Sequence, residues 1–230
     1  RFQIEKISME IYKIMVDSCV TSVGYSDPAR WKRVKIKNFH FGFSNPLLVY
    51  EIQNIPQDRR DCMIAIQAIS RSAEKGNLKL YTYIEIDCEM MLGFQSWKAN
   101  LSPLAAFQNI NFSKIQSPIE RSNFFITQDF AKGEIVEQFI DFLLKADESR
   151  LLYIMNKMPC CTDFEKNNVS KLSIFKNMCS DKVFGRKKAR DVYHFWAAEC
   201  SNIDYFLTTD MKFIRTYNNA VAHNNLITNC

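Results

Sequence analysis

Short continuous apolar runs alternate along the chain with longer runs of helical spacing, which predicts strands and helices in turn. The run "YKIMV" is bounded by polar residues, and it predicts a buried strand over residues 12–16. Similar runs predict strands over residues 34–43, 78–86 and 203–207. Because such alternation favours a parallel sheet with helices on both faces, the predicted fold class is α/β.

Apolar residues three and four positions apart predict the helices. One stripe runs from Pro56 to Lys75 and ends before Gly76, a residue type common just past a helix C-terminus. Another stripe starts at Ile135, and Thr162 with Glu165 has the spacing of a capping box. Two shorter helices are predicted over residues 47–54, where Pro46 suits the first turn, and over residues 191–200.

The middle of the chain lacks the strand signal of its two ends. The pattern is weak from about residue 90 to residue 122, which indicates loops, and it is helical beyond that stretch. We therefore predict one domain, with a core at about 11–90 and 183–220 and a helical insertion at about 95–182.

Composition and charge narrow the classes of protein to which this chain could belong. With 230 residues and 47% hydrophobic content the chain can bury a core, and its net charge of +5 permits a polyanionic partner without requiring one. Eight cysteines without a C-x-x-C pair argue against a zinc site or a disulfide framework and favour reduced thiols in the cytoplasm. Lys13 and Asp17 interrupt the apolar run near the N-terminus, so we expect no membrane association.

Four carboxylates are expected at one edge of the predicted sheet. Asp17 and Asp210 follow predicted strands, whereas Glu51 and Asp191 lie on helices that would begin at the same edge, where sites of α/β sheets gather. Oxygen ligands suit Mg²⁺ and Mn²⁺, and two such ions can activate a water against a phosphodiester. These four acids are the predicted catalytic and metal-binding set.

The acids can also be interpreted as residues that serve only the structure and take no part in a site. Asp191 could only favour a helix start, and Asp210 could only form a turn. Glu51 could lie on the solvent face of its helix, and Glu89, which follows another predicted strand, is the alternative second acid.

Four segments in order resemble the PIN-domain nucleases: "IMVDSCV", "SNPLLVYEI", "DVYHFWAAE" and "YFLTTDMKF". The resemblance covers about residues 11–75 and 183–216, and the middle is long for that family. It implies a three-layer α/β/α fold, the four acids as metal ligands, Thr208 as a polar support and His194 as a supporting residue. Cys19 stands where the family often has Asn or Ser.

Two basic stretches are candidates for binding the RNA backbone, because Lys and Arg contact phosphate and an aromatic ring stacks on an unpaired base. A solvated basic surface is the alternative for both. The candidate residues are Arg30, Trp31, Lys32 and Arg33 in the first stretch and Arg186, Lys187 and Lys188 in the second.

Three functions follow from these features. The first is a metal-dependent endoribonuclease acting on single-stranded or loop RNA, which includes the toxins of toxin–antitoxin pairs; an antitoxin or other protein partner, a homodimer and a DNA target stay open. The second is a PIN-like RNA-binding or assembly module with little catalysis. The third, a phosphatase of the haloacid-dehalogenase type, ranks last because that family needs an aspartate where this chain has Cys19.

Overall fold

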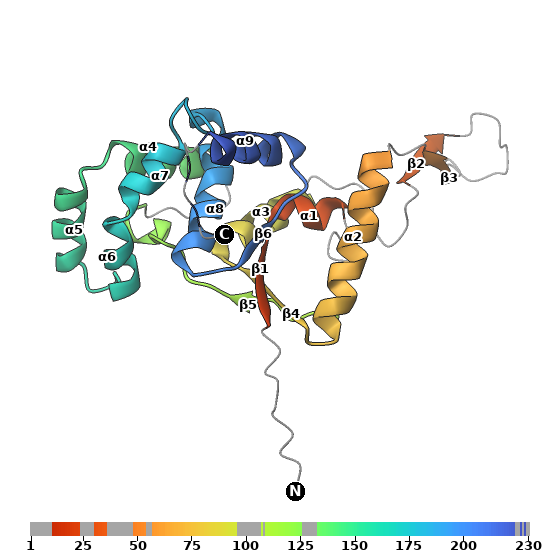
Figure 1. Ribbon diagram of the computed structural model, residues 1–230, viewed down its shortest axis with the longest axis horizontal. Coiled ribbons are helices and arrows are strands. Elements are labelled where there is room, and N and C mark those ends of the chain that lie inside the picture. The colour runs from red at the N-terminus through yellow and green to blue at the C-terminus, as the bar shows by residue number, and fades with distance from the viewer. Residues whose placement is uncertain are drawn as a thin grey trace, which may run out of the picture.

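Four parallel strands form the main sheet, in the order β5–β4–β1–β6 (Figure 1). The strands are β1 (Tyr12–Val16), β4 (Leu78–Thr82), β5 (Ser113–Lys114) and β6 (Tyr205–Leu207). This computed structural model describes residues 11–23, 30–35, 48–53, 57–95, 107, 109–125, 133–223, 226 and 228. The predicted α/β class with a parallel sheet is confirmed, and the strand predicted over residues 12–16 is β1.

Side chains of β1 alternate between two hydrophobic clusters, as the two-residue period of a strand requires. Met15 packs into the larger cluster, which includes residues of α3 (Ile84–Gln95) and α8 (Ala189–Cys200). Ile14 and Val16 pack into a smaller cluster with Leu80 of β4 and Ile66 of α2 (Gln57–Glu74). Burial on both sides explains why this strand reads as a continuous apolar run.

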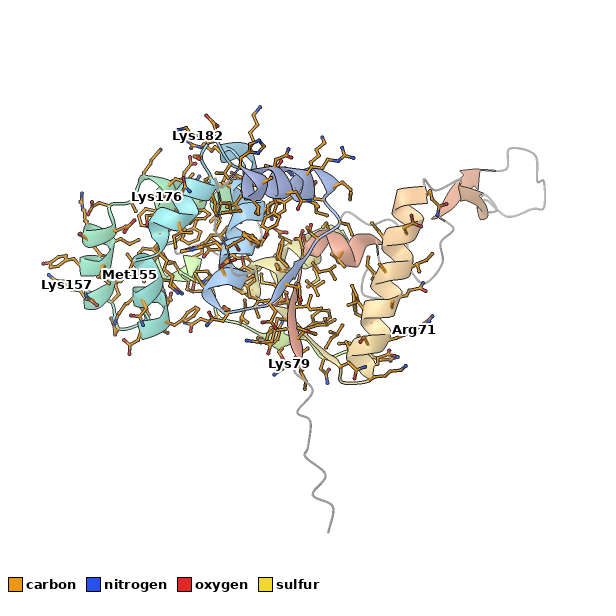
Figure 2. All side chains as sticks on the ribbon, viewed as in Figure 1. Arg71, Lys79, Met155, Lys157, Lys176 and Lys182 are labelled. Atoms are coloured by element: carbon orange, nitrogen blue, oxygen red, sulfur yellow. The ribbon has the colours of Figure 1, made fainter. Side chains whose placement is uncertain are left out.

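Some helices surround the sheet, and the others form a separate group on one side of it (Figure 1). Within that group Met155 is buried, and Lys157, two residues later, lies at the outer surface (Figure 2). The helices are α1 (Ser18–Val23), α2 (Gln57–Glu74), α3 (Ile84–Gln95), α4 (Gly133–Lys145), α5 (Glu148–Lys157), α6 (Asp163–Val169), α7 (Leu172–Met178), α8 (Ala189–Cys200) and α9 (Met211–Ala222), with 3₁₀ turns η2 (Arg121–Asn123) and η3 (Arg186–Lys188).

Several helix signals are confirmed. The stripe from Pro56 to Lys75 is α2, and Gly76 follows it with a φ of +77°, a conformation that glycine adopts without steric cost. Thr162 and Glu165 form both hydrogen bonds of the capping box at the start of α6. The helix predicted over residues 191–200 is α8.

The helix predicted over residues 47–54 is wrong. That segment contains β3 (Leu48–Gln53), which pairs antiparallel with β2 (Arg30–Lys35) in a sheet of their own. The β-branched and aromatic residues of "LVYEIQ" favour an extended chain, and the partner strand satisfies its backbone groups. The strand predicted over residues 34–43 begins earlier, as β2, and its part from 36 to 43 lies outside the described residues.

The strand predicted over residues 78–86 ends at Thr82, and α3 begins at Ile84. Glu85 and Asp87 in the first turn of α3 favour a helix start, because their charges oppose the partial positive charge of that terminus. The prediction of loops from about residue 90 is therefore wrong as far as Gln95. Helix α9 was not predicted, and Asp210 caps its N-terminus rather than only forming a turn.

Candidate functional site

Asp17 lies directly after β1, where its backbone N–H donates to the Leu207 carbonyl of β6 at 3.0 Å. Its carboxylate is buried, and Oδ2 accepts hydrogen bonds from Thr208 Oγ1 at 2.8 Å and from Cys19 Sγ at 2.9 Å. Burial and the adjacent Asp17 charge raise the pKa of Cys19 to about 12, so the thiol keeps its proton and can donate. Cys19 thus supplies a polar contact to Asp17 from the position where PIN-domain nucleases often have Asn or Ser.

Glu89 reaches the same place from α3. Its Oε2 accepts from Ser18 Oγ at 2.6 Å, and its Oε1 accepts from His194 Nε2 at 2.9 Å and from the Arg190 guanidinium. Burial opposes the charge of this carboxylate, but the hydrogen bond and charge of His194, together with Arg190 and Ser18, lower the pKa of Glu89 to about 2. Glu89 is therefore ionised at neutral pH.

His194 is buried, and each of its two ring nitrogens has a hydrogen-bond partner. Because the ionised Glu89 only accepts, Nε2 carries the proton of that hydrogen bond, and Nδ1 lies 2.6 Å from the Tyr83 hydroxyl. Burial disfavours the imidazolium, but the hydrogen bond to Glu89 and its charge raise the pKa of His194 overall. This histidine positions Glu89, which fits the supporting role predicted for it.

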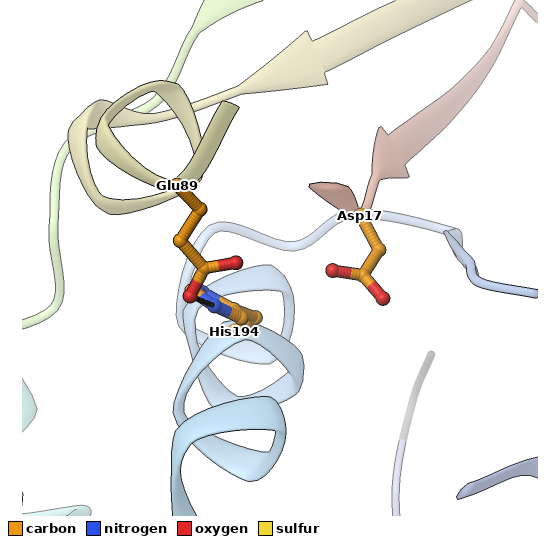
Figure 3. Close-up of side chains that lie close together, drawn as sticks. All are labelled: Asp17, Glu89 and His194. Carbon is orange, nitrogen blue, oxygen red and sulfur yellow. Dashed lines mark hydrogen bonds and ion pairs between the residues drawn. The ribbon is translucent and has the colours of Figure 1, made fainter. Parts of the chain in front are cut away.

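Asp17, Glu89 and His194 form one cluster (Figure 3). One oxygen or nitrogen of each residue lies within 4.8 Å of those of the other two, and Figure 3 shows the Asp17 and Glu89 carboxylates facing each other with His194 beside Glu89. They come from three elements far apart in the sequence, which meet at the carboxyl ends of β1 and β4.

Asp191 and Asp210 are joined by one lysine. Lys188 Nζ lies 3.0 Å from Asp191 Oδ2 and 2.5 Å from Asp210 Oδ2, while Asp210 Oδ1 accepts from the Lys212 and Phe213 N–H groups of α9. Burial and the nearby Asp17 charge raise the pKa of Asp191 despite Lys188. Burial opposes ionisation of Asp210 as well, but the Lys188 hydrogen bond and the α9 N–H groups lower its pKa overall.

Thr208 connects this pair to the cluster, since it donates to Asp17 and accepts from the Asp210 N–H at 3.2 Å. The structure therefore brings together Asp17, Asp191 and Asp210 with Glu89. Glu51 is not among them: it lies in β3, opposite Lys32 of β2 in the strand register, and these two strands lie beyond one end of α2 and apart from β1, β4 and β6 (Figure 1).

The residues predicted to bind RNA lie on two elements, β2 and η3. Arg30, Trp31, Lys32 and Arg33 follow one another along β2. In η3, Arg186 pairs with Asp141 and Lys187 is exposed, so only Lys188 of the three contacts the candidate site.

Sequence reasoning missed Ser18 and Tyr83 as site residues, and it placed Arg190 only at the end of the second basic stretch, Arg186 to Arg190. Ser18 and Arg190 are neighbours in sequence of predicted residues, and that adjacency was the available signal. Tyr83 offered none, because its contact with His194 spans 111 positions.

The two carboxylates of the cluster fit a hard divalent cation. An ionised carboxylate has about four acceptor positions, and the protein contacts of Glu89 use two on Oε1 and one on Oε2. Asp17 Oδ2 is used by Thr208 and Cys19, while Ser18 is 3.5 Å from Oδ1 and already donates to Glu89. Each carboxylate thus keeps acceptor capacity for Mg²⁺ or Mn²⁺.

No protein-family model, curated protein or solved structure matches this chain. The site's own chemistry is therefore the basis for assigning a function. Among the described residues, no helix has both the length and the apolar content needed to cross a membrane.

Acid should destabilise the protein as Glu89 takes up its proton. The pKa of Glu89 is about 2 when folded against an ordinary 4.5, so its contribution is full above about pH 4.5 and is lost as the pH falls toward 2. We expect the free energy of urea unfolding, measured in EDTA, to drop as the pH falls below about 4.5, and to drop less in Glu89→Gln. Glu74→Gln, at an exposed position of α2, should keep the wild-type slope. Equal slopes in both variants would contradict this account of Glu89.

Proposed function

We propose that the protein is a metal-dependent endoribonuclease with a PIN-like three-layer fold, cutting single-stranded or loop RNA. The observation that carries the proposal is the pairing of a partly buried, ionised Glu89 with the buried Asp17 at the carboxyl edge of the parallel sheet. Burying two facing carboxylates is costly unless a cation compensates them. A function as a toxin under an antitoxin stays a prediction from the sequence.

Asp17 and Glu89 would hold Mg²⁺ or Mn²⁺. When bound, such an ion lowers the pKa of a water and neutralises charge that develops on phosphate oxygens. Ser18, Arg190 and His194 keep Glu89 ionised and fixed in orientation, while Thr208 and Cys19 do so for Asp17. In the hydrolysis, water adds its oxygen to phosphorus, the ester P–O bond breaks, and the departing oxygen takes up a proton.

The test is cleavage of an end-labelled, mixed-sequence single-stranded RNA by the wild-type protein with Mn²⁺ or Mg²⁺. We expect cleavage with metal and none with EDTA, because the reaction needs the cation to activate water. RNA binding without cleavage under all metal conditions would contradict the nuclease proposal. It would favour the PIN-like binding module, which is consistent with acids that Lys188 and Arg190 already partly neutralise.

The same cleavage assay distinguishes Glu89 from Glu51 as the second acid of the site. We expect Glu89→Gln to lower the rate about 10²-fold or more, the loss that removal of one group that stabilises the reacting centre causes in other enzymes. Glu51→Gln is the matched control and should cleave like the wild type, since Glu51 lies in the separate β2–β3 sheet. The reverse result would return Glu51 to the site.

A further inference from the structure

Lys188 was predicted to contact the RNA backbone, and its ammonium group lies between two acids of the site. Its side chain is 32% exposed, and Nζ contacts Asp191 at 3.0 Å and Asp210 at 2.5 Å. These contacts are 3 and 22 positions away in sequence, so a local helical pair and a tertiary pair share one cation. An ammonium held by two carboxylates occupies the kind of position that a metal ion takes in a two-metal site.

The backbone fixes Lys188 in this position. Gly185 has a φ of +76°, which starts the turn into η3, and its N–H donates to the Ser180 carbonyl at 2.9 Å. Asp210 is fixed in turn by the two N–H groups of α9 that it caps. The hydrogen bonds from Lys188 to the two acids raise its pKa despite partial burial, so it stays charged at neutral pH.

The acids of the site outnumber the lysine and arginine side chains that contact them. Asp17, Glu89, Asp191 and Asp210 carry four negative charges when ionised, and Lys188 and Arg190 supply two positive charges through direct contacts with three of them. The negative charge in excess of these two cations is what a divalent ion such as Mg²⁺ or Mn²⁺ would balance. Asp17 lies beside Glu89 in the cluster that could hold such an ion.

We propose that Lys188 is the second cation of this site: one divalent ion binds at Asp17 and Glu89, and the Lys188 ammonium holds a phosphate oxygen of the substrate in place of a second metal. The inference rests on the proposed function and specifies its metal content. An ammonium has three N–H donors, and its contacts with Asp191 and Asp210 use two. The third can donate to a phosphate oxygen, a charge-assisted hydrogen bond of the stronger kind.

The experiment counts bound Mn²⁺ by electron paramagnetic resonance of the free ion, on the full chain and without RNA. We expect one Mn²⁺ per wild-type chain. In Lys188→Met the freed Asp191 and Asp210 should take a second Mn²⁺, raising the count from one to two. Lys187→Met changes the neighbouring exposed lysine and should leave the count at one.

Asp191→Asn provides a second test, which does not depend on Lys188→Met folding. A site with one metal at Asp17 and Glu89 keeps its count of one in this variant, whereas a two-metal site loses an ion. Two Mn²⁺ on the wild type, or one on a folded Lys188→Met, would overturn the role of Lys188 and leave the nuclease proposal standing. No Mn²⁺ on the wild type would overturn the proposed metal site and the inference with it.

Discussion

Asp17→Asn should abolish metal-dependent RNA cleavage, with a rate loss of about 10³-fold or more. Asp17 has the central contacts of the site, because Thr208 and Cys19 hold its Oδ2 while the carboxylate faces Glu89. An amide accepts hydrogen bonds at its oxygen but carries no charge for a cation. The measurement is the initial cleavage rate with Mn²⁺, beside circular dichroism to show that the variant is folded.

Asp204→Asn is the matched control. Asp204 also lies at the main sheet, but its Oδ2 accepts from the Lys13 N–H at 2.7 Å, near the start of β1 rather than its carboxyl end. We expect this variant to cleave at about the wild-type rate. Equal activity of wild type, Asp17→Asn and Asp204→Asn would assign the cleavage to a contaminating nuclease or to a different site.

The placement of Asp17 and Asp210 could be predicted from the sequence because it follows from local pattern. "YKIMV" ends one position before Asp17 and "YFL" ends three positions before Asp210, and parallel strands bring their carboxyl ends to one edge. The pairing of β1 with β6 spans about 190 positions, yet predicting that both aspartates lie at one edge required only that the two strands run parallel. That is a property of the fold class rather than of any single contact.

The second acid could not be chosen in the same way. Glu51 and Glu89 both follow short apolar segments, and segments of this length do not distinguish a strand from a helix by periodicity. The outcome depends on β2 pairing with β3 and on β4 ending at Thr82, which are tertiary facts. The contacts of Lys188 with Asp191 and Asp210 could not be predicted for a related reason, because a basic run does not reveal which of its members turns inward.

A buried ion pair anchors the helix that carries Glu89. Glu85 lies one turn before Glu89 on α3, and its Oε1 accepts from Arg121 Nε at 3.0 Å. Both side chains are almost wholly buried, at 7% and 2% exposure. Arg121 belongs to η2, in the stretch that the sequence indicated only as loops, so this stretch contributes directly to the packing of α3.

Arg121→Met should therefore destabilise the fold by about 3–5 kcal/mol, because it leaves the Glu85 charge buried without this partner. Domains of this kind have a total stability of about 5–15 kcal/mol, so the change is a large fraction of it. The measurement is the free energy of unfolding in urea. Replacing both partners, as Arg121→Met with Glu85→Leu, should recover most of the loss, since the uncompensated charge is then gone.

The pair formed by Lys114 and Asp87 supplies the comparison. Asp87 lies two positions after Glu85 on α3, and Lys114 is 60% exposed, so water screens this contact. Lys114→Met should cost no more than about 1 kcal/mol. If Arg121→Met cost as little, burial would not be what makes the Glu85 pair important, and α3 would be held mainly by the apolar contacts of Ile86 and Tyr83.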